Sequence, residues 1–213
     1  MKKQISVFTL LFLIVFIMST AVSADQIELQ NGQSLRGEVQ NDSLNLKTVY
    51  AELNIQSKYI NKINRENGSF VFGASENNKF SGQLLSDIIF LAKGEERTFS
   101  ASEITSIDFS DNDSFSDNKQ VSVNLRNGDY FFGSTVENSI SINTALGSPL
   151  NVSYNNIISI EYLNKEEIYL IKRDSASNIK SDLSGQKIII WPAAGEIVEL
   201  EYDYLRKINF SQQ

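Results

Sequence analysis

The chain has no cysteine and no histidine among its 213 residues. Without cysteine it has no disulfide bonds and no cysteine-linked lipid, so its stability has to come from packing. The missing histidine, together with the missing cysteine, excludes the usual zinc sites and the Ser-His-Asp and Cys-His forms of catalysis. We therefore expect no metal, no cofactor and no catalytic residue.

Proline and basic residues are also scarce. The chain has two prolines, and its 19 lysines and arginines face 26 aspartates and glutamates. Ile, Val, Leu, Phe and Tyr dominate the apolar residues beyond residue 24, and no stretch there keeps a helical period, which is typical of β proteins. The acidic balance disfavours binding to nucleic acid and to anionic lipid surfaces.

The first 24 residues form a separate segment. Lys2 and Lys3 precede an uncharged, mostly apolar run, which ends in Val22-Ser23-Ala24. This pattern predicts a secretory signal peptide that is cleaved after Ala24. The alternative is a retained membrane anchor, because the run is just long enough to span a bilayer. Cleavage would leave about 189 residues with a formal charge of −9 and an exported, periplasmic or extracellular location.

A short pattern around a small anchor residue occurs four times after residue 24. The anchors are Gly37, Gly82, Gly133 and Ser181. A large apolar residue stands two positions before each anchor, and an apolar pair follows seven and nine positions after it. Those pairs are Leu44/Leu46, Ile89/Leu91, Ile140/Ile142 and Ile188/Ile190. Each unit closes on I-x-x-I or L-x-x-I. Self-similarity at this period indicates a repeat protein.

One unit reads as about five short strands. In the first, an alternating strand leads into Asn31-Gly32, a favoured hairpin turn, and three further alternating segments follow. So few short strands are not stable as a flat sheet in water, whereas a small barrel buries the apolar pairs and leaves few open edges. The anchor glycine fits a place where two backbones approach closely.

The hairpin turns and anchor glycines of units one and three resemble the repeat of a known protein family. Asn31-Gly32 with Leu35-x-Gly37, and Asn127-Gly128-Asp129 with Phe131-x-Gly133, are similar to the N-G-D-x-L-x-G-x-V repeat of exported bacterial proteins with SH3-like or Sm-like small barrels. The resemblance implies an all-β fold of four tandem five-stranded barrels and a setting in the cell envelope. Units two and four depart from it, because Glu76-Asn77 and Ser175-Ala176 replace Asn-Gly, so we expect looser first hairpins there.

The anchor spacing divides the chain into two pairs of units. The predicted boundaries are a signal peptide at 1–24, barrel repeats at 25–66 and 67–109, an acidic linker at 110–119, and barrel repeats at 120–163 and 164–213. The linker is polar and is unlike the units on either side.

The even units differ from the odd units beside the inward-facing pair. Ile88 and Phe90 in unit two, and Ile189 and Trp191 in unit four, occupy positions that are polar in units one and three. A strand that is apolar on both faces is buried on both faces. We therefore expect these four residues to be mostly buried, either between units of the chain or against a partner, and we take them as the candidate interface.

Other candidate sites have simpler explanations. Asp111, Asp113 and Asp117 could bind calcium, but the twelve-residue loop is incomplete, and a solvated linker is the better reading. Trp191 could stack on a sugar ring or anchor a partner, or else it covers a contact between units. Neighbouring glutamates occur at 95/96, 166/167 and 199/201; a glycosidase needs carboxylates across a cleft, but surface charge explains these pairs better.

The sequence predicts a non-enzymatic, exported β-repeat protein that serves as a protein-interaction or scaffold module in the bacterial cell envelope, by contact with another protein or by self-association. The alternative is a module that binds cell-wall polysaccharide through exposed aromatic residues. A carboxylate-based hydrolase is the third reading, and it would need carboxylates that converge in a pocket.

Overall fold

A computed structural model of the chain describes residues 24–110, 113, 120–143, 148–192, 195 and 197–211. These residues form an all-β structure with short 3-10 turns, as the sequence predicts. The strands of the first half are β1 (Asp25–Leu29), β2 (Ser34–Val39), β3 (Ser43–Lys47), β4 (Glu52–Gln56), β5 (Ile60–Glu66), β6 (Ser69–Ala74), β7 (Asn78–Leu84), β8 (Ile88–Ala92), β9 (Glu95–Phe99) and β10 (Ile104–Asp108). Those of the second half are β11 (Val121–Leu125), β12 (Tyr130–Thr135), β13 (Ser139–Asn143), β14 (Pro149–Ser153), β15 (Ile157–Leu163), β16 (Ile168–Arg173), β17 (Ile179–Ser181), β18 (Lys187–Pro192), β19 (Val198–Glu201) and β20 (Leu205–Phe210).

The strands of the first half belong to two modules, one nested inside the other in sequence. Module 1 has the strand order β9-β8-β2-β1-β10, so it combines the two ends of this half. Module 2 has the order β4-β3-β7-β6-β5 and is a continuous segment. Antiparallel pairing of β10 with β5 joins the two modules. The chain therefore leaves module 1 after β2, builds all of module 2, and returns.

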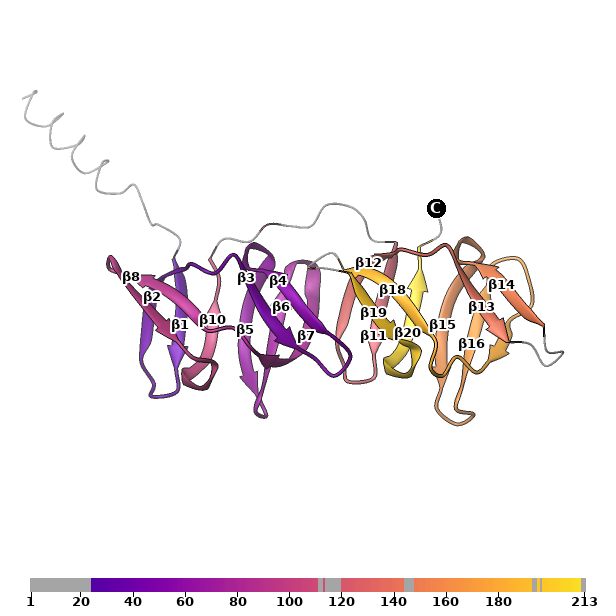
Figure 1. Cartoon of the computed structure of the whole chain (residues 1–213), viewed down its shortest axis with the longest axis horizontal. Helices are drawn as coiled ribbons and strands as arrows, with labels where there is room; N and C mark the ends of the chain where they lie inside the picture. The colour runs from indigo at the N-terminus through magenta and orange to yellow at the C-terminus, as the bar shows by residue number, and fades with distance from the viewer. Residues whose placement is uncertain are drawn as a thin grey trace, which may run out of the picture.

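The second half repeats this arrangement. Module 3 has the order β19-β18-β12-β11-β20, and module 4 consists of the continuous strands β13 to β17. Pairing of β15 with β20 joins these two modules. Figure 1 shows the four modules in a row, with module 1 at one end and module 4 at the other.

The sequence units and the modules therefore do not coincide. We expected each unit to curl into its own closed barrel, but in units one, two and four the third strand pairs with the anchor strand of the neighbouring unit, and the described sheets are open. The predicted boundary between residues 66 and 67 falls in the turn between β5 and β6. Asn41 contributes to this exchange, because its amide Nδ2 donates to the Asp87 carbonyl at 3.0 Å and its Oδ1 accepts from the Ile89 amide at 2.8 Å. These bonds hold the two crossing loops together.

The anchor glycines lie where the crossing strands meet. A Cβ atom at Gly37 would lie 2.1 Å from the Leu91 carbonyl oxygen, one at Gly82 would lie 2.3 Å from that of Lys47, and one at Gly133 would lie 2.5 Å from that of Trp191. No side chain fits in such a contact. The repeated glycine in the sequence is therefore required wherever a strand of one unit pairs with the anchor strand of its neighbour. In module 4 the anchor is Ser181, and there β13 and β14 form a separate two-stranded sheet that does not pair with β17.

Candidate functional site

The third strand of each unit buries one alternating pair, and the structure corrects one of the predicted pairs. Leu44/Leu46, Ile140/Ile142 and Ile188/Ile190 are buried as expected. In unit two the buried residues are Ile88 and Phe90, both 0% exposed, whereas Ile89 and Leu91 are half-buried. The register there is shifted by one residue from the predicted one. Five consecutive apolar residues, 88–92, gave no alternation by which to set it.

The four candidate interface residues separate into two kinds. Ile88 and Phe90 belong to the core of module 1. Ile189 and Trp191 lie on β18 in module 3, where Ile189 is half-buried and Trp191 is 59% exposed. Ile88 and Phe90 are buried within the chain as expected, whereas packing between units does not cover Trp191. Trp191 is exposed because its neighbours Ile190 and Pro192 occupy the inner face, and alternation along the strand turns the indole outward.

An apolar surface surrounds Trp191. Ser134 of β12 is its direct strand partner, Ile197 precedes β19 and is 55% exposed, and Val136 follows β12 and is 50% exposed. At the margin of this face, the Lys187 ammonium lies 3.0 Å from Glu199 Oε2. Hydrogen bonding to Glu199 and the charge of Glu199 raise the pKa of Lys187. We call Ser134, Val136, Ile189, Trp191 and Ile197 the Trp191 face.

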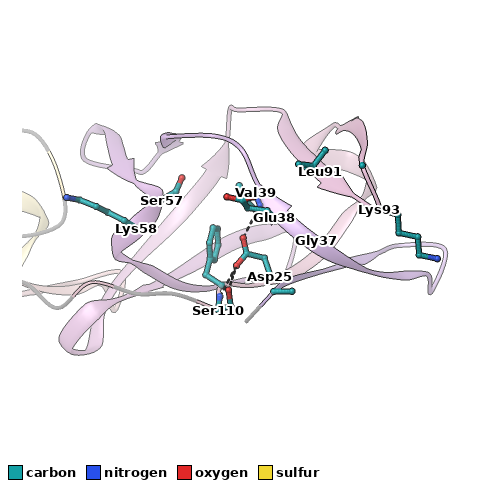
Figure 2. A pocket seen from close by; sticks show the side chains of 12 residues that line it. Asp25, Gly37, Glu38, Val39, Ser57, Lys58, Leu91, Lys93 and Ser110 are labelled. Carbon is teal, nitrogen blue, oxygen red and sulfur yellow. Dashed lines mark hydrogen bonds between the residues drawn. The ribbon is translucent and has the colours of Figure 1, made fainter. Parts of the chain in front are cut away.

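A hollow of about 570 Å³ lies around Asp25, lined by module 1 and by Ser57 and Lys58 of module 2. In Figure 2 the Asp25 side chain points toward Val39 and Ser110, whereas the side chains of Lys58 and Lys93 extend away from it. Asp25 Oδ2 accepts from the Val39 amide at 2.9 Å, and Oδ1 accepts from the amide and hydroxyl of Ser110 at 2.8 and 2.9 Å. All three donors belong to residues at the ends of strands. The Asp25 carboxylate therefore ties the start of β1 to the ends of β2 and β10.

The three glutamate pairs singled out from the sequence do not converge with one another. Glu95 pairs with Arg97 at 2.9 Å on β9, Glu166 pairs with Lys180 at 2.7 Å, and Glu199 pairs with Lys187, so these acids sit at separate surfaces. No group of three or more Asp or Glu side chains within the described ranges is placed to hold a metal ion. Of the three acidic linker residues, Asp113 lies 3.9 Å from the Lys58 ammonium, and Asp111 and Asp117 lie outside the described residues.

The tyrosines are mostly engaged in the fold. Tyr169 and Tyr202 are buried and pack edge to face with centroids 5.8 Å apart, and the Tyr169 hydroxyl donates to the Tyr202 carbonyl. The Arg126 guanidinium lies 3.7 Å from the centre of the Tyr162 ring, so it covers one face of that ring. Burial raises the pKa of Tyr169 and of Tyr202, and it raises that of Tyr154 to about 12. These rings do not form an open aromatic groove.

A polar junction between modules 2 and 3 was not predicted from the sequence. Asp129 is 1% exposed, and its Oδ2 accepts from the Tyr50 hydroxyl at 3.0 Å and from the Ser81 amide at 3.1 Å. Burial and the nearby Asp129 charge raise the pKa of Tyr50. Beside this contact, the Phe80 and Phe131 rings stack with centroids 5.5 Å apart. The only signal was that Asp129 follows the Asn-Gly turn of unit three, where unit one has Gln33.

Comparisons with protein-family models, with characterised proteins and with solved structures found no match. Across the described part of the chain, no helix is long and apolar enough to span a membrane.

Proposed function

We propose that this protein is exported after removal of residues 1–24 and acts without catalysis as a protein-binding scaffold in the bacterial cell envelope. The observation that supports this proposal best is the Trp191 face. The chain's single tryptophan is 59% exposed on an ordered strand, between two further exposed apolar side chains. Exposed apolar surface of this kind marks contact sites, and tryptophan is enriched among the residues that dominate binding energy.

The row of modules supports a scaffold role. The junction around Asp129 and the strand pairing between modules fix the spacing of surfaces along the row (Figure 1). We further propose that each module is an opened relative of the SH3-like or Sm-like small barrel. Two features support that kinship. Each module has five short strands, and a 3-10 turn precedes the last strand of modules 1 and 3 and the third strand in sequence of modules 2 and 4.

Binding of cell-wall polysaccharide is the second candidate. Trp191 supports it as well, because an exposed indole can stack on a sugar ring. The engaged tyrosines favour the protein-binding proposal, since Tyr162 is covered by Arg126 and Tyr169 and Tyr202 are buried. A sugar would therefore meet one aromatic ring on this face rather than a platform of several.

A capture experiment with a matched variant tests the two candidates. The tagged protein is incubated with a solubilised envelope fraction and, in parallel, with purified peptidoglycan. Trp191→Ala should weaken capture of a specific envelope protein by about thirtyfold, the effect of losing roughly 2 kcal/mol at a central contact. Val49→Ala, at a 63% exposed residue of module 2, is the control and should have no effect. Binding to peptidoglycan that depends on Trp191 would favour the second candidate. If Trp191→Ala and Val49→Ala both capture the envelope protein as well as the wild type does, the proposed role of the Trp191 face is refuted.

A further inference from the structure

One crossing in the described part of the chain lacks the strand pairing that the other three have. In modules 1, 2 and 3 the anchor strand pairs with the third strand of a unit: β2 with β8, β7 with β3, and β12 with β18. The corresponding pair in module 4 would be β17 with β13. Among the described residues β13 pairs only with β14, and β17 only with β16.

The backbone groups at this edge of β13 can be assigned. The Tyr154 amide donates to the Asn138 carbonyl at 2.9 Å, so the carbonyl of Asn138 faces β14. Because the direction alternates along a strand, the amides and carbonyls of Ser139, Ser141 and Asn143 face away from β14. In module 2 the corresponding residue, Asn45, uses both groups: its carbonyl accepts from the Leu85 amide at 2.9 Å, and its amide donates to Ser86 Oγ at 2.8 Å.

The chain itself turns away from this edge. After β17 ends at Ser181, Asp182 Oδ1 accepts from the Ser184 amide at 2.9 Å in a local turn. Hydrogen bonding from Ser184 lowers the pKa of Asp182, so the turn is held by an ionised carboxylate. The backbone that would continue β17 beside β13 is therefore used in a turn, although Leu183 is still buried in the core.

This edge also lacks the features that usually protect a free strand edge. Charged side chains line two of the other edge strands, with Glu95, Glu96 and Arg97 on β9 and Glu199 and Glu201 on β19. Such charges discourage the addition of a further strand. The exposed side chains of β13 are Ser139, Ser141 and Asn143, which are short and uncharged.

We propose that the free edge of β13 binds an extended segment of another protein, which adds as an antiparallel strand. The three occupied crossings define its chemistry: apolar-x-Gly-x-apolar or a close variant, as in Phe80-x-Gly82-x-Leu84 of β7. The glycine is required because a Cβ atom at the occupied anchors would lie 2.1 to 2.5 Å from a carbonyl oxygen of the facing strand. Main-chain pairing supplies affinity and the alternate side chains supply selectivity. This site is separate from the Trp191 face and does not depend on it.

A labelled peptide with the sequence of residues 78–86 is the probe, and the same peptide with valine in place of its glycine is the control. Fluorescence anisotropy with the full chain should show saturable binding of the first peptide and at least about tenfold weaker binding of the second. The Ser141→Pro variant removes an amide at the free edge without removing a β13–β14 hydrogen bond, and it should abolish binding. Glu96→Pro makes the matched change on β9 and should leave binding intact.

Two further measurements keep the test decisive. Asn143→Pro removes a second amide of the same edge and should also abolish binding, and far-UV circular dichroism confirms that each variant folds. Hydrogen exchange at the Ser141 amide should slow when the peptide is bound. Absence of saturable binding, or equal binding by wild type, Ser141→Pro and Asn143→Pro, would overturn the proposal. A dimer of the protein alone that Ser141→Pro abolishes would also overturn it, because the edge would then serve contact between copies. Trp191→Ala should leave peptide binding unchanged.

Discussion

Replacing Gly133 by valine tests the close approach on which strand exchange depends. The Cβ atom of valine would lie 2.5 Å from the Trp191 carbonyl oxygen and 2.9 Å from Ile190 Cγ2. An ordinary contact begins near 3.4 Å, so β12 and β18 have to move apart by about 1 Å. That displacement strains the packing of the module 3 core and weakens the β12–β18 ladder, including the 3.0 Å hydrogen bond from the Val136 amide to the Ile189 carbonyl.

The expected loss follows from these contacts. Overpacking of a core costs about 1–3 kcal/mol, and each weakened hydrogen bond adds up to about 1 kcal/mol. We expect Gly133→Val to lower the free energy of unfolding by about 2–4 kcal/mol. With a urea dependence of about 2 kcal/mol per molar, the unfolding midpoint falls by about 1–2 M. Urea titration followed by far-UV circular dichroism measures this shift.

Two matched variants isolate the cause. Gly73→Val is also a strand substitution, but a Cβ there would lie 3.7 Å from the nearest neighbouring atom, the Lys62 carbonyl oxygen, so it should be tolerated. Ser181→Val should cost less than Gly133→Val, because module 4 already accommodates a side chain at its anchor. Equal midpoints for Gly133→Val and Ser181→Val, or a Gly73→Val variant as unstable as Gly133→Val, would refute the reasoning.

Phe90→Asp should unfold module 1, because it places a charge at a 0% exposed core position, whereas Asn45→Asp at an exposed position should be nearly silent; thermal unfolding compares them. Asp129→Ala removes two hydrogen bonds to a buried carboxylate and should loosen the junction, detected as earlier proteolytic separation of the two halves. Raising the pH from 10 to 12 should cost about 2 kcal/mol of stability, because burial raises the pKa of Tyr154 from 10.0 to about 12 and the unfolded chain ionises first; phenolate absorbance should therefore rise together with unfolding. Mass spectrometry of the exported protein should find Asp25 at its N-terminus, and a retained 1–24 segment would contradict this.

The strands could be predicted from the sequence because each carries its own alternation of apolar and polar residues. Leu44/Leu46 and Ile188/Ile190 are examples of pairs whose burial follows directly from that alternation. Which strands pair could not be predicted, because alternation defines a face of a strand and not its neighbour. Gly37 indicated close backbone approach, but nothing local to it indicated that the approaching strand is β8, about fifty residues away in the chain.

The candidate site was predicted in part. The unusual apolar positions of the even units were correctly noticed, but Ile88 and Phe90 are core residues and Trp191 is exposed. The junction at Asp129 could not be foreseen, since its partners Tyr50 and Ser81 lie far away in sequence and become neighbours only through the nested topology. The open edge of β13 could not be predicted for the same reason. Whether a strand edge is paired depends on a segment that is distant in the sequence.

The nesting of module 2 within module 1 determines which pieces of this chain can exist alone. Residues 25–66, a complete repeat by sequence, contain two strands of module 1, β1 and β2, and three strands of module 2, β3, β4 and β5, so they cannot form either sheet completely. The smallest piece that keeps all its pairings is a whole half, 25–110 or 120–211, apart from contacts across the junction. A fragment cut at the repeat boundary would expose two sets of unpaired edges, and two such fragments would have to find each other before either could fold. Gain or loss of a single repeat would break a module in the same way, so chains of this design can lengthen or shorten only by whole pairs.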